Sequence, residues 1–341
     1  MNDSHDRYRR QILLREIGSA GQDKINGKTA VIIGCGALGC ATAEILTRAG
    51  VGRIRLADRD FVELSNLQRQ VLFDESDAAE RLPKATAARR KLSAINSVVS
   101  IEDNVVDITP RNVEEIIQGA DVVLDGTDNA ETRFLINDAC IKHDIPWVYG
   151  GAVGMEGLAA ALSPDGPCLR CFLPEPPPPG SLATCDSQGV LSTSPLTTAA
   201  MQATEALKLL LGDNSGIGVM TTFDIWNRRF RTVRLRKAVG CPACGERTFP
   251  FLEATSTSRT SRLCGRCAVQ ITPAGPAAAP VDLEQLGQRL RSAYACHFNG
   301  ILLTVKTEQL EIIIFPDGRS IVKGTLEESV ARTVLARILA N

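Results

Sequence analysis

The chain has 341 residues, of which 44% are hydrophobic and 23% are charged, and its formal net charge is -1. This length allows one large α/β domain and a smaller second domain. Because the charge is close to neutral, there is no overall basic field, and nucleic acid is not an expected partner. The amino-terminal residues are polar and charged, and no apolar run approaches the ~18–20 residues that span a bilayer. We therefore expect a cytoplasmic protein that does not enter a membrane.

The first 150 residues alternate strand and helix patterns. Gly50 closes one expected helix and Pro83 opens another, as these residue types favour. The alternation predicts an α/β fold with a doubly wound, mostly parallel, Rossmann-like sheet. In chain order, we expect a helical lead-in at 7–26, a strand at 28–33, a helix at 40–49, a strand at 53–57, a helix at 83–96, a strand at 98–106, a helix at 110–118, a strand at 121–124, a helix at 129–142 and a strand at 147–150.

The pattern changes after residue 150. Residues 157–162 predict a strand. The run PEPPPPG at 174–180 predicts a stiff, extended crossover loop, because proline fits neither a helix interior nor a central strand. A helix at 195–211 and a strand pair within 223–236 are expected to complete a first domain, residues 1–245.

The remaining residues predict a linker and a small module. Residues 246–280 are rich in Ser, Thr, Pro and Ala, which is typical of a linker. Residues 281–341 predict a small α+β module, in which Pro-Asp-Gly at 316–318 marks a turn. Its expected elements are helices at 282–292 and 326–339 and strands at 300–306, 310–315 and 319–322.

A glycine-rich loop follows the first expected strand. Gly34, Gly36 and Gly39 form a GxGxxG motif that contains Ala37 and opens a helix, and such a loop lets the backbone approach a phosphate. Asp58 ends the second strand, where an acid typically holds the hydroxyl groups of a ribose. The motif indicates a nucleotide, NAD included. The alternative is that the glycines serve only tight packing between helix and strand.

Charged segments around this loop favour phosphate chemistry. SNLQRQ at 65–70 follows the second strand, Lys84 starts a helix, RYRRQ lies at 7–11, and Thr-Asp-Asn at 127–129 follows the strand at 121–124. An NAD-dependent dehydrogenase has no need for gathered cations. A reaction that displaces pyrophosphate does need them, because Arg and Lys stabilise the charge that develops. Asp128 is then expected to hold Mg²⁺, which prefers oxygen ligands.

Two CxxC pairs point to a metal. Cys168 and Cys171 form the first pair, and Cys241 and Cys244 form the second. In a cytosolic chain this spacing favours metal or sulfur chemistry over disulfides. Four cysteines make a closed, tetrahedral Zn²⁺ site, which is structural because it leaves no open coordination position. The alternative is four buried thiols without a metal.

Together these segments resemble the ThiF/MoeB/HesA family, the bacterial relatives of ubiquitin-activating enzymes. The resemblance covers about residues 7–245, and the SNLQRQ and TDN segments are more specific than the glycine loop. Its matching segments are RYRRQI, GCGALG, LADRDFVELSNLQRQ, LPKA, DGTDN, PWVYGGAVGMEG and the paired CxxC. Some ThiF proteins also carry a similar carboxy-terminal extension, whose short segments here read CGRC at 264–267, DGR at 317–319 and GT at 324–325.

The resemblance implies a role for each matching residue. Asp58 binds the ribose, Asp128 is required for adenylation and binds Mg²⁺, and Arg10 is donated across a homodimer interface into the partner's active site. It also places zinc at the paired CxxC. The residues implied to contact the ATP phosphates are Asn66, Arg69 and Lys84. The full set of ATP-binding candidates is Gly34, Gly36, Ala37, Gly39, Asp58, Asp60, Ser65, Asn66, Arg69, Lys84, Thr127, Asp128 and Asn129.

The remaining cysteines divide into three groups. Cys185 follows the proline-rich loop and is expected to be exposed. In related proteins a cysteine of this loop bonds covalently to the activated carrier, whereas in MoeB-like members it is dispensable; the role requires a thiolate. For Cys264 and Cys267 a redox or sulfur-relay pair and an incidental pair both stay open. The cysteines expected to pack as small hydrophobic residues are Cys35, Cys40, Cys140 and Cys296. The catalytic candidates are Arg10, Arg69, Lys84, Asp128 and Cys185.

The resemblance implies a reaction between ATP and a small ubiquitin-like sulfur-carrier protein. The C-terminal glycine carboxylate of the carrier attacks the α-phosphate, pyrophosphate leaves, and the acyl-adenylate then receives sulfur from a persulfide donor. The leading carrier is ThiS of thiamine (thiazole) synthesis. MoaD of molybdopterin synthesis comes second, and other sulfur carriers third. An NAD-dependent dehydrogenase and a non-catalytic scaffold that docks a carrier are the other function classes.

Overall fold

The computed structural model describes residues 6–177, 185–253, 260–263, 267–273 and 281–340. Contacts between residues divide the chain into two compact units. The first is Met1–Ala79 with Lys84–Ala254, and the second is Glu80–Pro83 with Thr255–Asn341. Within the described ranges, no helix combines the length and the apolar character that a membrane span requires.

An eight-stranded sheet forms the centre of the first unit. Its strands, in spatial order, are β3 (Ser100–Asn104), β2 (Arg53–Ala57), β1 (Thr29–Ile33), β4 (Val122–Asp125), β5 (Trp147–Val153), β6 (Glu156–Leu162), β7 (Val219–Asp224) and β8 (Arg229–Arg234). The strands from β3 to β5 are parallel, and β6, β7 and β8 continue the sheet in antiparallel fashion. The order of the strands reverses between β1 and β4, which is where open α/β sheets bind ligands.

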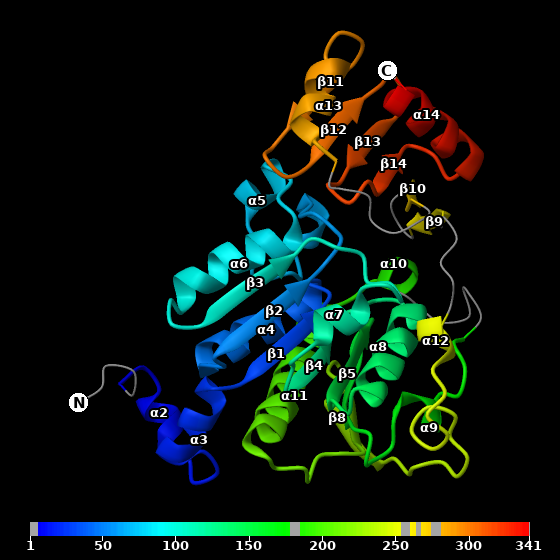
Figure 1. Cartoon of the computed structure of the whole chain (residues 1–341). Coiled ribbons are helices and arrows are strands. Elements are labelled where there is room, and N and C mark those ends of the chain that lie inside the picture. Colours follow the sequence, from blue (N-terminus) through cyan, green and yellow to red (C-terminus); the bar gives the residue numbers. More distant parts are fainter. Residues whose placement is uncertain (1–5, 178–184, 254–259, 264–266, 274–280, 341) are drawn as a thin grey trace. The chain divides into compact units, whose positions relative to one another are not determined.

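Helices cover both faces of this sheet (Figure 1). One layer contains α4 (Ala37–Ala49), α6 (Lys84–Ile95) and α11 (Thr193–Leu211), and the other contains α7 (Val113–Ile117) and α8 (Ala130–Lys142). The predicted doubly wound, mostly parallel α/β fold is therefore confirmed. The shorter helices of the unit are α2 (Arg9–Ile12), α3 (Gly18–Asn26), the 3-10 helix η1 (Leu64–Asn66), α5 (Glu75–Ala79), α9 (Leu169–Phe172), α10 (Cys185–Gln188) and α12 (Pro250–Glu253).

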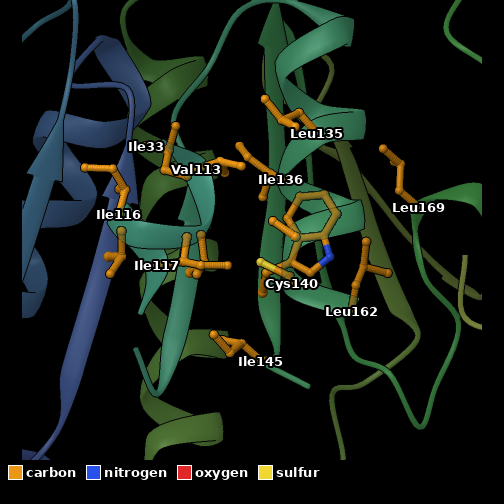
Figure 2. Packing of buried hydrophobic residues seen from close by; sticks show 14 of the residues in the cluster. Ile33, Val113, Ile116, Ile117, Leu135, Ile136, Cys140, Ile145, Leu162 and Leu169 are labelled. Carbon is orange, nitrogen blue, oxygen red and sulfur yellow. The ribbon is translucent and has the colours of Figure 1, made fainter. Parts of the chain in front are cut away.

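The buried core explains why β1 is apolar from Ala30 to Ile33. Val31 and Ile33 belong to the cluster that α7 and α8 form over the sheet. Ile32 faces the opposite side, where its side chain lies against Gly39 of α4. Because both faces of the strand are buried here, no polar residue interrupts these four positions. Figure 2 shows part of the cluster, including Ile33, Ile116, Ile117, Ile136 and Cys140.

Several boundaries differ from the predicted ones. The helical lead-in at 7–26 is two helices, α2 and α3, because the chain turns between them and Gly18 adopts a positive φ of 59°. Helix α4 starts at Ala37, three residues earlier than predicted. Strand β5 continues to Val153, and β3 is shorter than the predicted range 98–106.

The second unit contains a six-stranded antiparallel sheet. Its spatial order is β11 (Ala295–Phe298), β12 (Leu303–Lys306), β13 (Glu311–Ile314), β14 (Ser320–Lys323), β10 (Ala268–Ile271) and β9 (Thr260–Leu263). Helices α13 (Leu283–Leu290) and α14 (Glu328–Ala340) bury their apolar residues against it. This arrangement confirms the predicted α+β module.

Part of the predicted linker at 246–280 belongs to this sheet. All four residues of β10 are buried, and the strand pairs with β14 on one side and β9 on the other. This strand was not predicted from the sequence. It has only four residues, three apolar and one amide, and so short a run inside a Ser/Thr/Pro/Ala-rich stretch shows almost no periodicity. Strand β11 was also not predicted.

Candidate functional site

Three loops meet at the carboxyl ends of β1, β2 and β4. Ile33 pairs with Ala57 on one side and with Asp125 on the other, so the loops that follow these strands leave the sheet side by side. The N–H of Gly34 donates to the carbonyl oxygen of Ala57 at 2.8 Å, and the N–H of Gly126 donates to that of Ile33 at 2.7 Å. The glycine loop, the predicted ribose-binding acid and the TDN segment therefore share one edge of the sheet.

The three motif glycines have different reasons to be glycine. Gly34 has a positive φ of 91°, and a Cβ there would lie 2.6 Å from the carbonyl oxygen of Gly126. A Cβ on Gly39 would lie 1.7 Å from the carbonyl oxygen of Gly34. A Cβ on Gly36 would meet only the Gly126 carbonyl oxygen, at 3.8 Å. Gly36 is the N-cap of α4 and makes no side-chain capping bond, so the start of this helix suits an anion.

A buried ammonium and two carboxylates lie beside the glycine loop. One carboxylate oxygen of Asp58 accepts the N–H of Cys35 and the other accepts the N–H of Asp60, both at 2.6 Å. The backbone N–H of Lys84 donates to the carbonyl oxygen of Asp60 at 2.8 Å, and its Nζ lies 3.3 Å from the Asp60 carboxylate. Burial raises the pKa of the Asp58 carboxyl, and the nearby Lys84 ammonium opposes that rise. The predicted residues Asp58, Asp60 and Lys84 thus form one cluster.

Two residues that the sequence analysis missed hold the TDN segment. The guanidinium of Arg133 pairs with the buried Asp125 carboxylate at 3.0 Å and donates to the carbonyl oxygens of Thr127 at 2.8 Å and Gly150 at 3.2 Å. Asp125 also accepts the N–H and the hydroxyl of Thr127, at 2.9 and 2.6 Å. From α11, the Gln202 amide donates to the carbonyl oxygen of Asp125 at 2.8 Å. The Thr127 hydroxyl is therefore used for a hydrogen bond within the loop.

The side chains of the TDN segment differ in their environments. Asn129 caps α8, because its Oδ1 accepts the N–H of Thr132 at 2.8 Å. Asp128 is exposed, between these structural neighbours. Burial lowers the pKa of Arg59, but the carboxylates of Asp107 and Asp60, and then that of Asp128, outweigh it and raise the pKa overall. Arg59 was also missed, since an arginine between two aspartates carries no motif of its own.

The SNLQRQ segment forms η1 and the turn after it. Asn66 is buried, and its side-chain oxygen accepts the N–H of Glu63 at 3.1 Å in a capping arrangement. The guanidinium of Arg69 donates to the carbonyl oxygen of Ser65 at 3.0 Å, and Ser65 itself is exposed. These bonds give the segment, which follows β2 in the chain, a defined shape.

Arg10 lies far from the glycine loop of its own chain. Its neighbour Tyr8 is buried, accepts a hydrogen bond from the Asn96 amide at 2.8 Å, and lies against Gly50. Gly50 ends α4, a helix of 13 residues, which makes it about 20 Å long. Helix α2 therefore sits at the opposite end of α4 from the glycine loop, with the Arg10 side chain exposed.

The two CxxC pairs converge on one point. The four Sγ atoms lie within 4.8 Å of one another, with Cys168–Cys171 at 3.9 Å, Cys168–Cys241 at 3.6 Å and Cys171–Cys244 at 3.4 Å. Four sulfur atoms bound to zinc at ~2.3 Å in a tetrahedron lie ~3.8 Å apart, so the cluster has the dimensions of a Cys₄ zinc site. Among the described residues this is the one group of three or more potential ligands that converge in this way.

The other cysteines are placed as follows. Cys185 begins α10, and its side chain lies outside the described residues, as does Cys264. Cys267 is exposed. Cys35, Cys40 and Cys140 are buried, as predicted, and burial raises the pKa of Cys40 to about 11. Cys296 is half-buried.

Comparisons with known proteins agree with this arrangement. A model described as the ThiF family matches residues 8–243. The chain is 43% identical over 332 residues to the sulfur carrier protein ThiS adenylyltransferase of Bacillus subtilis, which covers 96% of this chain and 97% of that protein. It is 41% identical to the SAMP-activating enzyme E1 of Haloferax volcanii, over 71% of this chain and 89% of that one.

Solved structures resemble the fold. One is E. coli MccB crystallised with AMPCPP and MccA, with a TM-score of 0.62 and 22% sequence identity, covering 70% of this chain and 74% of that one. At this identity the likeness speaks for the architecture alone.

Proposed function

Because the chain belongs to the ThiF family, we propose that it uses ATP to adenylate the C-terminal carboxylate of a ubiquitin-like sulfur-carrier protein. The observation that carries this proposal is the shared edge where the glycine loop, the Asp58–Asp60–Lys84 cluster and the braced TDN segment meet. We assign ThiS as the carrier, since the likeness to the Bacillus subtilis enzyme extends over nearly the whole length of both chains. MoaD, the second carrier that the family resemblance implies, is the second candidate.

In this proposal the site acts mainly by positioning and by charge. The phosphates lie over the start of α4, and the Asp58 carboxylate, whose oxygens have further lone pairs, receives the ribose hydroxyl groups. A carboxylate nucleophile is already ionised near pH 7, so no general base is needed. Lys84 and Arg69 neutralise the charge that builds on the phosphates as pyrophosphate leaves, and the Asn66 amide contacts the phosphates as a neutral donor. The held loops keep the nucleophile and the α-phosphate in line.

Mg²⁺ is assigned to the exposed carboxylate of Asp128. This residue suits the ion, because Mg²⁺ usually takes one or two carboxylates and completes its shell with substrate phosphates and water. Bound there, the ion lowers the negative charge on the phosphates. Arg133, Asp125 and the Asn129 cap hold the loop, so the Asp128 side chain is presented from a fixed backbone.

The four cysteines are assigned to one structural Zn²⁺. The sulfur separations fit the ion, and all four positions are protein ligands, so it contributes stability and takes no part in the reaction. Because the described cysteines form no disulfide and the proposed substrate is ATP, we also assign the protein to the cytoplasm.

Arg10 is proposed to act in the site of a second copy of the chain. Its position at the far end of α4 supports this, because a side chain there does not reach the glycine loop of its own chain. A homodimer is then part of the working enzyme. A mixture of Arg10→Ala and Arg69→Ala subunits should recover activity in those dimers where one site keeps both arginines. Dimers of confirmed mixed composition that stay inactive contradict this role.

The later steps are assigned to partners. The acyl-adenylate receives sulfur from a separate persulfide donor, and Cys185 is proposed as the thiol that bonds to the activated carrier. In this step the Cys185 thiolate would displace AMP from the acyl-adenylate and form a thioester with the carrier. Cys185→Ser should leave adenylation intact while it removes this thioester adduct, as detected by mass spectrometry. An adduct that persists in this variant refutes the role of Cys185.

The deciding experiment is carrier-dependent exchange of pyrophosphate into ATP. Purified ThiS and MoaD are each tested with the wild-type protein and with Asp128→Ala. We expect exchange with ThiS, and loss of that exchange in the variant. Absence of exchange with every ubiquitin-like carrier, together with measurable ATP binding, favours the non-catalytic scaffold. Exchange with MoaD alone reassigns the carrier but keeps the reaction.

A further inference from the structure

Arg59 is a cation beside the proposed nucleotide site that the proposed reaction does not use. It comes directly after Asp58, at the carboxyl end of β2. Its guanidinium donates to the carboxylate of Asp107 at 3.2 Å. The two side chains are 30% and 21% exposed, so the ion pair is largely shielded while part of it stays open to a ligand. Both residues belong to the first unit.

Asp107 follows the strand that lies next to β2. Strand β3 forms the edge of the sheet beside β2, and Ala57 pairs with Asn104 (Figure 1). The pairing extends one residue further, because the N–H of Asp58 donates to the carbonyl oxygen of Asn104 at 3.1 Å. The Arg59–Asp107 ion pair therefore bridges the two loops that leave these neighbouring strands.

The loop that carries Asp107 is held by contacts that do not involve Arg59. Val106 and Ile108 pack against the core cluster that α7 and α8 form over the sheet. The Nδ2 of Asn112 donates to the carbonyl oxygen of Asp107 at 2.8 Å. Asp107 thus offers an acceptor from a fixed backbone, and its charge-assisted hydrogen bond limits the orientations of the Arg59 guanidinium.

The order of the strands sets the direction in which a nucleotide lies. In the proposed function the phosphates lie over the start of α4, which follows β1, and the ribose binds Asp58 at the end of β2. The ribose joins the phosphates to the base, so the base extends from Asp58 away from α4, toward the loop after β3. Arg59 and Asp107 lie on that side of Asp58.

The charges around Arg59 favour a neutral ring over a phosphate. Four carboxylates act on its guanidinium, those of Asp107, Asp60, Asp128 and Asp58. A phosphate bound directly to Arg59 would bring further negative charge next to these groups, whereas an adenine ring brings none.

We infer that Arg59 binds the adenine base of ATP by stacking its guanidinium plane on the ring, and that Asp107 positions this plane. A guanidinium is planar and stacks on aromatic faces, and a lysine at such a position is not an equivalent replacement. The inference rests on the proposed function, which puts the ribose on Asp58. It adds a residue for the base to a site whose other assigned side chains serve the ribose, the phosphates and Mg²⁺.

The test separates the two ends of ATP. Full-length Arg59→Ala is compared with the wild type for binding of adenosine, which has the base without phosphates, and of inorganic tripolyphosphate with Mg²⁺, which has phosphates without the base. By calorimetry, the affinities for adenosine and for ATP should fall by roughly 5- to 30-fold, as for the loss of a contact between a cation and an aromatic ring. The affinity for tripolyphosphate should not change. Arg59→Lys keeps the charge without the plane and should not restore the binding of adenosine.

A double-variant cycle tests the role of Asp107. Asp107→Asn removes the charge that holds the guanidinium and keeps the size of the side chain, so it should weaken adenosine binding by a smaller factor than Arg59→Ala. Added to Arg59→Ala, it should have no further effect, because it acts through Arg59. The matched control is Arg53→Ala. Arg53 starts β2 at the opposite end of the strand and pairs with Glu102 at 3.4 Å, and its variant should bind adenosine like the wild type.

The outcomes separate this inference from the proposed function. A wild-type protein that binds ATP but exchanges no pyrophosphate with any carrier contradicts the proposed function, and the adenosine comparison still decides the role of Arg59. Wild-type affinity for adenosine in Arg59→Ala overturns the inference. So does an equal loss of affinity for tripolyphosphate, since that is the result of a phosphate contact. A lower melting temperature with unchanged adenosine binding overturns it as well, because the ion pair would then be purely structural.

Discussion

Gly36 and Gly39 stand three residues apart in one loop, and the structure predicts opposite outcomes when each becomes alanine. In Gly39→Ala, the new methyl group would lie 1.7 Å from the carbonyl oxygen of Gly34, so backbone must move. We expect a loss of about 3 kcal/mol of stability, typical of severe overpacking. In Gly36→Ala, the nearest surrounding atom is 3.8 Å away, and the stability should change by no more than about 1 kcal/mol, the cost of alanine at an N-cap.

Gly36→Ala, which should change the stability little, should instead weaken the binding of ATP. Its methyl group stands at the first turn of α4, where a phosphate oxygen has to come within ~2.9 Å of a backbone N–H. We expect the affinity for ATP to fall about 10- to 100-fold, or ~1.4–2.8 kcal/mol. Thermal unfolding gives the stability of both variants, and calorimetry gives the affinity for ATP. Wild-type affinity in Gly36→Ala, or wild-type stability in Gly39→Ala, refutes the division of roles between the two glycines.

Three further predictions concern residues around the site. Arg133→Met leaves the buried Asp125 carboxylate without its cation and should cost about 3–5 kcal/mol in denaturant unfolding, and adding Asp125→Asn should recover part of that loss; equal stability of the single and double variants contradicts the ion pair. Elemental analysis should find one Zn²⁺ per chain, lost together with several degrees of melting temperature in Cys241→Ser; retention of zinc in Cys241→Ser with Cys244→Ser refutes the Cys₄ site. Burial raises the pKa of Asp138 to about 6, so its ionised form lowers stability above that pH, and this cost fades as the pH falls toward ~4; Asp138→Asn should therefore raise the melting temperature at pH 8 and not at pH 4.

Sequence alone predicted the parts of the fold that follow from local patterns. The strand at 28–33, the glycine loop and the acid at Asp58 are recognisable because periodicity and turn chemistry act over a few residues. The converging CxxC pairs were predictable because cysteine spacing carries its own geometry. The family resemblance supplied the roles of Asn66, Arg69 and Arg10, which no spacing rule provides.

What sequence did not predict depends on contacts between distant residues. Arg133 and Gln202 are ordinary helical residues in sequence, and only the packing of α8 and α11 against β4 makes them supports of the TDN loop. Strand β10 is short and lies within a stretch of linker composition, and its burial comes from pairing with β14. The grouping of Glu80–Pro83 with the carboxy-terminal sheet has no local signal at all.

The cysteine cluster also has a consequence for how the chain is made. Cys168 and Cys241 are 73 residues apart. At about 5–20 residues per second, the ribosome needs roughly 4–15 s to extend the chain from the first CxxC pair to the second. During that interval the first two thiols have emerged without their partners, while β1, β2 and β4 are already available to pair. The nucleotide-binding half can thus assemble before the second CxxC pair is made. The cysteine cluster, which joins α9 to the segment after β8, then forms late.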